Sequence, residues 1–164
     1  THDQVEAMSM SDRIAIMKDG KILQVAPPAE MYQYPENEFI ASFLGNPPIA
    51  FLDGIVSDDN VVIQSADIKL PLPENIEVPT SGSRIGLGIR PEFYQPHHPH
   101  KIPGTVSFVE IQGRENLYDI NLKDGSLLRS IQPADVSPLS PGTKVEWGVN
   151  PEQLLFFDSL GKRL

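Results

Sequence analysis

Residues 104–131 read GTVSFVEIQGRENLYDINLKDGSLLRSI, and their pattern decides the class of fold. They contain three short apolar or alternating runs, at residues 104–111, 117–122 and 127–131. The turn-forming triplet Lys123-Asp124-Gly125 separates the second run from the third. Short runs bounded by such turns are typical of β-strands, so this stretch predicts three successive strands.

The same spacing extends through residues 49–164. Six further runs lie at residues 51–56, 61–64, 68–72, 85–89, 144–149 and 154–157. Many short strands joined by Gly/Pro turns favour a small β-barrel over an α/β sheet. We expect the large side chains of this part to fill the barrel core, namely Phe108, Trp147, Phe156 and Phe157.

Residues 1–45 differ in composition from the rest, because they hold only 3 of the 16 prolines and 2 of the 12 glycines. Asp19-Gly20 predicts a two-residue hairpin between strands at residues 13–18 and 21–25. Short helices are expected after Asp3, over residues 28–34, and from an Asn37 cap to Gly45. We therefore divide the chain into residues 1–45 and residues 46–164.

Composition excludes several classes of function. The chain carries 13 Lys+Arg against 22 Asp+Glu, a net charge of −9, which disfavours nucleic-acid binding. There is no cysteine and hence no disulfide framework. The longest uncharged stretch, residues 39–52, is far shorter than the ~20 apolar residues of a membrane-spanning helix.

The first eight residues, Thr1-His2-Asp3-Gln4-Val5-Glu6-Ala7-Met8, closely resemble a segment of one protein family. They are similar to the switch-histidine segment in the ATPase subunits of ABC importers, above all the maltose-type carbohydrate importers. The resemblance implies that His2 contacts the γ-phosphate of ATP and is catalytic in a longer parent protein. The alternative is a lone surface histidine beside a helix cap.

The motifs that bind and hydrolyse ATP are absent from these 164 residues. No G-x-x-x-x-G-K-[ST] loop occurs, nor an apolar strand ending in Asp-Glu, nor the Leu-Ser-Gly-Gly-Gln signature of the family. The chain therefore resembles the C-terminal part of such a subunit, and residues 1–45 resemble the end of its nucleotide-binding domain. ATP and Mg²⁺ are expected as cofactors of the parent only, and this chain alone is expected to be inactive.

The second part resembles the same family. It carries Gly88-Ile89-Arg90-Pro91-Glu92, then Gly104-Thr105-Val106 and Val109-Glu110-Ile111-Gln112-Gly113. The resemblance implies a mainly β fold, a small OB-fold-like (TOBE-like) barrel preceded by the α/β remnant of a nucleotide-binding domain. Arg90, Pro91, Glu92 and Gly113 are the candidate regulatory or structural residues.

Two roles remain open for Arg90 and Glu92. They could form a recognition pair for a partner. Alternatively, Arg90 could tie two loops together, because its guanidinium offers five donors in a fixed fork.

His97, His98 and His100 form the one cluster of metal-ligating side chains. Neutral imidazoles suit zinc, copper and nickel. Residues 96–103, however, hold three prolines, no cysteine and no carboxylate at a suitable spacing. We expect a surface loop here and no metal site.

Two functions of different classes follow. In the first, the chain is the regulatory and dimerisation part of an ABC importer's ATP-hydrolysing subunit, for sugars or related solutes. The resemblance then implies a second copy as partner, membrane-spanning subunits, a cytoplasmic regulator and a place on the cytoplasmic face of the inner membrane. In the second, the barrel is a stand-alone module that binds a small oxyanion.

Overall fold

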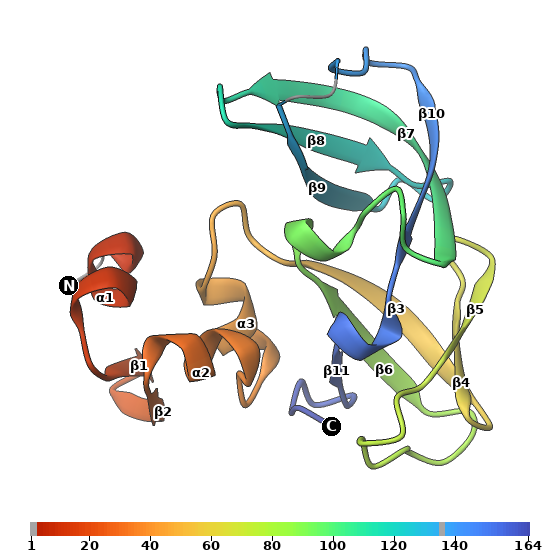
Figure 1. Cartoon of the computed structure of the whole chain (residues 1–164). Helices are drawn as coiled ribbons and strands as arrows, with labels where there is room; N and C mark the ends of the chain where they lie inside the picture. The colour runs from red at the N-terminus through yellow and green to blue at the C-terminus, as the bar shows by residue number, and fades with distance from the viewer. Residues whose placement is uncertain (1–2, 135–136) are drawn as a thin grey trace.

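A computed structural model describes residues 3–134 and 137–164, and Figure 1 shows its two parts. A helical N-terminal part with one small sheet packs beside two curled antiparallel sheets. The N-terminal part comprises α1 (Gln4–Met10), β1 (Ile14–Lys18), β2 (Lys21–Ala26), α2 (Pro28–Gln33) and α3 (Glu38–Phe43). The second part comprises β3 (Ala50–Ser57), β4 (Asn60–Ile63), β5 (Ile68–Pro71), β6 (Arg84–Ile89), η1 (Pro91–Phe93), β7 (His100–Ile111), β8 (Glu115–Asn121), β9 (Leu127–Pro133), β10 (Lys144–Val149), η2 (Pro151–Gln153) and β11 (Leu155–Phe157).

The hairpin predicted at Asp19-Gly20 is confirmed. β1 and β2 pair antiparallel, and both turn residues have positive φ, 50° for Asp19 and 75° for Gly20. Positive φ at both central positions defines the type I′ turn, whose twist matches that of the strands. These two strands form a sheet of their own.

The predicted helix caps are confirmed as well. The Asp3 carboxylate accepts a hydrogen bond from the Glu6 amide (3.1 Å), and the Asn37 side chain accepts one from the Ile40 amide (3.0 Å). Each bond satisfies one of the free N–H groups at a helix start. No described helix is long and apolar enough to cross a membrane.

The second part is mainly β, as predicted. Five strands form one sheet in the order β11-β6-β3-β4-β5, and four form the other in the order β10-β7-β8-β9. All neighbours in both sheets run antiparallel. One apolar core lies between the sheets, which gives the OB-like half-barrel of Figure 1.

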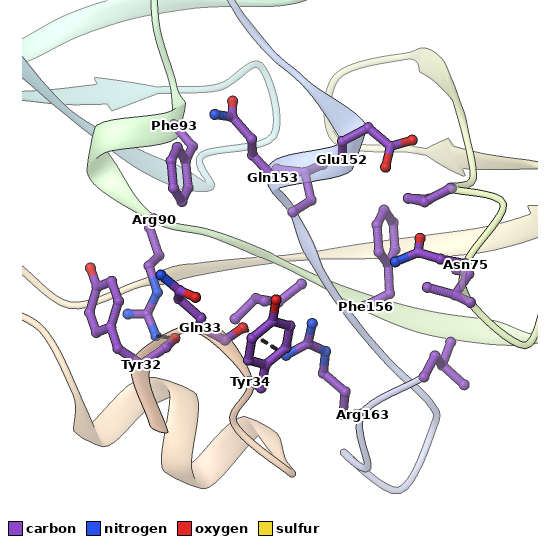
Figure 2. Close-up of a pocket in the computed structure, with 15 residues that line it drawn as sticks. Tyr32, Gln33, Tyr34, Asn75, Arg90, Phe93, Glu152, Gln153, Phe156 and Arg163 are labelled. Atoms are coloured by element: carbon purple, nitrogen blue, oxygen red, sulfur yellow. Dashed lines mark hydrogen bonds between the residues drawn. The ribbon is translucent and has the colours of Figure 1, made fainter. Parts of the chain in front are cut away.

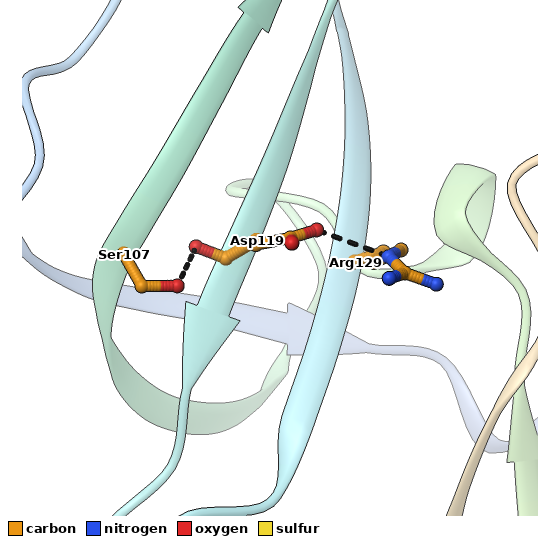
Figure 3. Close-up of polar contacts among 3 residues, drawn as sticks. All are labelled: Ser107, Asp119 and Arg129. Carbon is orange, nitrogen blue, oxygen red and sulfur yellow. Dashed lines mark hydrogen bonds and ion pairs between the residues drawn. The ribbon is translucent and has the colours of Figure 1, made fainter.

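The stretch at residues 104–131 forms the predicted three-stranded meander β7-β8-β9. Polar contacts join its strands, as Figure 3 shows. Ser107 Oγ donates to the Asp119 carbonyl (3.1 Å), and Arg129 Nε pairs with the Asp119 carboxylate (3.0 Å). Asp119 and Arg129 lie directly opposite each other on β8 and β9, the geometry in which opposite charges stabilise a sheet.

Two expectations about β7 are wrong. The strand begins at His100 rather than Gly104, because β10 continues to pair with it back to His100, so part of the expected loop is strand. Phe108 is 52% exposed instead of buried. A register shift lies between Val106 and Phe108, and β10 pairs with β7 only as far as Thr105, so the alternation that would have turned Phe108 inward is broken.

The remaining large side chains are buried as expected. Trp147 packs edge-on against Tyr118 (5.3 Å between ring centroids) and Tyr94 (5.9 Å), and Phe156 belongs to the same core. Phe157 is fully buried too, but it packs with Ala41, Ile49 and Leu155 in a separate cluster that joins α3 to the barrel. The barrel core is therefore aromatic at its centre, and a second apolar contact holds the N-terminal part.

Replacing Phe156 by alanine should lower the free energy of unfolding by about 3–5 kcal/mol, since a large buried side chain is lost from a packed core. Phe108→Ala is the matched control and should cost less than about 1 kcal/mol. Urea denaturation of dilute protein measures both. Equal losses for the two variants would contradict the burial described above.

Candidate functional site at the Arg90 junction

Arg90 directly follows β6 and is the charged side chain on which the two parts meet. It is only 3% exposed. Its Nη1 donates to the Leu44 carbonyl (3.0 Å) and its Nη2 to the Tyr32 carbonyl (2.8 Å). One planar guanidinium thus binds the ends of both α2 and α3, because its fork presents donors at a fixed spacing.

Tyr32 covers the guanidinium. The Arg90 Cζ lies 3.5 Å from the centre of the Tyr32 ring, and the Tyr32 hydroxyl donates to Glu92 Oε1 (2.6 Å). Burial and then the bond to Glu92 raise the pKa of Tyr32 to about 12. Burial lowers the pKa of Arg90, while the charge of Glu92 opposes that shift. The Arg90–Tyr32–Glu92 contacts therefore form one network.

Pro91 and Glu92 are placed by this network. Pro91 is buried at the start of η1, where its fixed φ suits the first helical position. Glu92 accepts the Tyr32 hydrogen bond across 60 residues of chain. Arg90, Pro91 and Glu92 are thus brought together, in an arrangement that ties loops within one chain.

The C-terminal segment, residues 158–164, also binds the loop between α2 and α3. The Gly161 carbonyl accepts a hydrogen bond from the Glu38 amide (2.9 Å), and the Arg163 amide donates to the main-chain carbonyl of Glu36 (2.9 Å). Arg163 Nη1 also donates to the Gln33 carbonyl (3.0 Å). The last residues of the chain therefore hold the loop between α2 and α3 against β11.

Glu38, an acidic residue at the start of α3, lies at the same contact. The half-buried Glu38 carboxyl has its pKa raised above the ordinary 4.5, first by burial and then by the charges of Asp53 and Asp158. A Cβ on Gly86 would meet Glu38 Oε1, so the glycine leaves room for this carboxylate in the position that it occupies here. Within the described residues no group of three metal-ligating side chains is placed to hold an ion.

The other predicted site residues do not join this cluster. His2 lies outside the described residues, so its expected role stays a prediction. Gly113 forms the turn between β7 and β8 with φ +86°, and nothing lies within 4 Å of where its Cβ would be. Its role is therefore conformational in this structure, since positive φ favours glycine.

The three histidines of residues 97–100 have different contacts. The rings of His97 and His98 pack edge-on with centroids 4.6 Å apart, and His98 Nδ1 bonds the Phe93 carbonyl (2.9 Å). His100 begins β7 opposite Val149.

Sequence reasoning missed Tyr32 and Arg163. Tyr32 contacts Arg90 through its carbonyl and its ring face, and Arg163 bonds a main-chain carbonyl. Such contacts need no particular sequence motif. Within the sequence, the one available signal was the Gly88–Glu92 motif, which marked Arg90 and gave no indication of what it contacts.

Comparison with known families shows which proteins this chain is similar to. A MalK OB fold domain matches residues 45–93, and a TOBE domain matches residues 87–157. The chain is 34% identical, over 99% of its own length, to the maltose/maltodextrin import ATP-binding protein MalK of Vibrio cholerae, of which it covers 45%. It is 42% identical over 70% of its length to the osmoprotective compounds uptake ATP-binding protein GgtA of Synechocystis, of which it covers 34%.

A third relative is the sn-glycerol-3-phosphate import ATP-binding protein UgpC 1 of Rhizobium johnstonii, 35% identical over 71% of this chain and 32% of that protein. The chain thus spans less than half the length of the curated relatives it matches. Its homologues are C-terminal, TOBE-containing regions of ABC import ATP-binding subunits. Along 99% of its length the chain is similar to the C-terminal region of the maltose-type members of this family.

A solved structure supports the fold alone. The cytoplasmic molybdate-binding protein ModG aligns with a TM-score of 0.53 over 65% of this chain and 93% of that chain, at 12% identity. The likeness extends to the architecture of the barrel and says nothing of a ligand.

Arg90→Lys should lower the free energy of unfolding by about 2–3 kcal/mol, because an ammonium cannot bond both carbonyls in the guanidinium's geometry. Amides of α2 and α3 should lose protection from hydrogen exchange before those of the barrel. Arg84→Lys, at an exposed arginine of β6, is the control and should change little. Equal protection in the two variants would show that Arg90 does not tie the parts.

Glu38→Gln should raise the melting temperature at neutral pH. A carboxyl whose pKa is raised by folding costs stability as the pH rises, because the unfolded chain ionises first. The gain should therefore shrink between about pH 7 and pH 4, where both states become protonated. Calorimetry across this range measures it, with the exposed Glu36→Gln as control; a gain independent of pH would contradict the assignment.

Proposed function

We propose that this chain is the regulatory and dimerisation part of the ATP-hydrolysing subunit of an ABC importer. The observation that carries the proposal is the match along 99% of this chain to less than half of the MalK protein of Vibrio cholerae. A phosphate-binding loop would lie in the part of that relative which this chain does not match. ATP and Mg²⁺ are thus cofactors of the longer parent, in which His2 would be the switch histidine at the γ-phosphate.

The surface of the N-terminal part supports a longer parent. Val5 is 72% exposed and Met10 80%, and no residue of α1 is buried. Met17, Ile22 and Val25 are exposed on the small β1-β2 sheet. Several large apolar side chains left exposed in one short part of a chain are typical of a contact with another polypeptide. In the proposal, the rest of the nucleotide-binding domain covers them.

The barrel offers its own contact surface. β7 runs on to Ile111 after its pairing with β10 has stopped at Thr105, and Phe108 and Ile111 are both exposed on this extension. An extended strand with large apolar side chains, and without a second neighbour among the described residues, invites pairing with another chain. We therefore place the two-fold contact between copies at this end of β7.

The remaining partners follow from the relatives. Import ATP-binding subunits act on membrane-spanning subunits, so we place the parent at the cytoplasmic face of the membrane through those partners, with a cytoplasmic regulator able to reach the barrel. The relatives are named for maltose, osmoprotective compounds and glycerol phosphate. A sugar or a related solute is therefore the proposed cargo class.

Sedimentation velocity at micromolar concentration tests the dimer. The unmodified chain should sediment as a dimer, and the double variant Phe108→Asp, Ile111→Asp should sediment as a monomer, because buried charges oppose an apolar contact. The matched control is Phe43→Asp, at an apolar residue of α3 that is 43% exposed, and it should remain a dimer.

The reverse result, a monomer only when Phe43 is changed, would assign pairing to the bare N-terminal surface and remove the barrel from the proposed role. If the unmodified chain and all variants are monomers, the barrel is likewise removed from the proposed role in dimerisation.

A further inference from the structure

A cavity lies between the N-terminal part, the barrel and the C-terminal segment. Its volume is about 350 Å³, within the range of small-molecule sites. Figure 2 shows Arg90 entering from the end of β6 and Arg163 from the C-terminal segment, with Gln33 and Tyr34 between them and Tyr32 on the outer side of Arg90. Phe93 and Phe156 supply apolar walls.

The cavity holds two guanidinium groups that lack a carboxylate partner. Among the described residues the one ion pair within 4.0 Å is Arg129–Asp119, on the far sheet. Arg90 bonds two neutral carbonyls and Arg163 bonds one. Glu92 lies near Arg90 but accepts the Tyr32 hydroxyl, and Glu152, the acidic residue that lines the cavity, is exposed.

The charge of Glu92 acts on Arg90, but the pair of cations remains costly because Arg163 adds a second positive charge beside it. Burial lowers the pKa of both arginines, and the charge of Arg90 lowers that of Arg163 further. Two of the five N–H donors of Arg90 and one of Arg163 are used in the bonds named above. Arg163, the more exposed of the two, keeps donors for an oxyanion, which guanidinium groups bind in a planar, two-point geometry.

The uncharged polar side chains that line the cavity indicate that a ligand also carries hydrogen-bonding groups. Gln153 lines the cavity, and its Oε1 is buried without a hydrogen-bond partner among the described residues. An amide oxygen in that state needs a donor, such as a hydroxyl group of a ligand. The amide of Asn75 on the opposite side can both donate and accept.

We infer that this cavity binds a small polyhydroxylated anion, a sugar acid or a sugar phosphate. Its carboxylate or phosphate lies on Arg163, beside the charge of the covered Arg90, and its hydroxyl groups bond Gln153 and Asn75. The ligand would hold the α2–α3 loop, the barrel and the C-terminal segment together from within. The site lies apart from the end of β7, so its failure leaves the proposed dimer untouched, and the reverse also holds.

Calorimetric titration of the full chain with gluconate and with glucose-6-phosphate tests the site. Sorbitol lacks the charge and hexanoate lacks the hydroxyl groups, so each should bind at least about tenfold more weakly than gluconate. A preference between gluconate and glucose-6-phosphate identifies the head group. If neither binds at concentrations up to about 10 mM, the inference is wrong. Equal binding of hexanoate overturns the assignment of the hydroxyl groups.

Two variants locate the ligand. Arg163→Gln should weaken gluconate binding at least about tenfold, as should Gln153→Glu, which adds a negative charge and removes no known hydrogen bond. The second variant keeps the test valid if loss of Arg163 loosens the C-terminal segment. Arg84→Gln, at an exposed arginine of β6, is the control and should bind normally. Normal binding by Gln153→Glu would place the ligand elsewhere.

Discussion

The burial of one positive charge organises this molecule. The Arg90 guanidinium is nearly inaccessible to water, so its N–H groups must find acceptors within the protein. It finds them on the Leu44 and Tyr32 carbonyls, which end α3 and lie near the end of α2. Both helices are six residues long and would be marginal alone, so their position depends on what binds their ends. The apolar cluster of Ala41, Ile49, Leu155 and Phe157 then packs beneath this tie.

Much of the fold follows from local rules. Asp19-Gly20 could be read as a hairpin because both positions need positive φ, and Asn37 could be read as a cap because its side chain replaces a missing backbone acceptor. Phe108 could not be placed this way. Strand alternation predicts burial only while the register is regular and the neighbouring strands continue to pair, and both conditions fail beyond Thr105.

The site was predictable in part. The Gly88–Glu92 motif drew attention to Arg90, and the fixed fork of a guanidinium suggested that it ties loops. Its partners were not predictable, because they are main-chain carbonyls 46 and 58 residues away, and any residue type supplies a carbonyl. Arg163 was hidden for the same reason. It bonds Gln33 across 130 residues, a pairing set by topology alone.

That long-range contact bears on how the protein is made. Residues 161–163 fasten the segment from Gln33 to Glu38, which leaves the ribosome many residues earlier. During synthesis the α2–α3 segment therefore has neither its Arg90 nor its Arg163 bonds, and closure waits for the barrel between them. Closing so large a loop has an entropic cost that a preformed barrel reduces, because it brings Arg90 and Arg163 to one side together. Residues 161–163 thus complete an attachment of residues 33–38 that cannot form until about 125 further residues have been made.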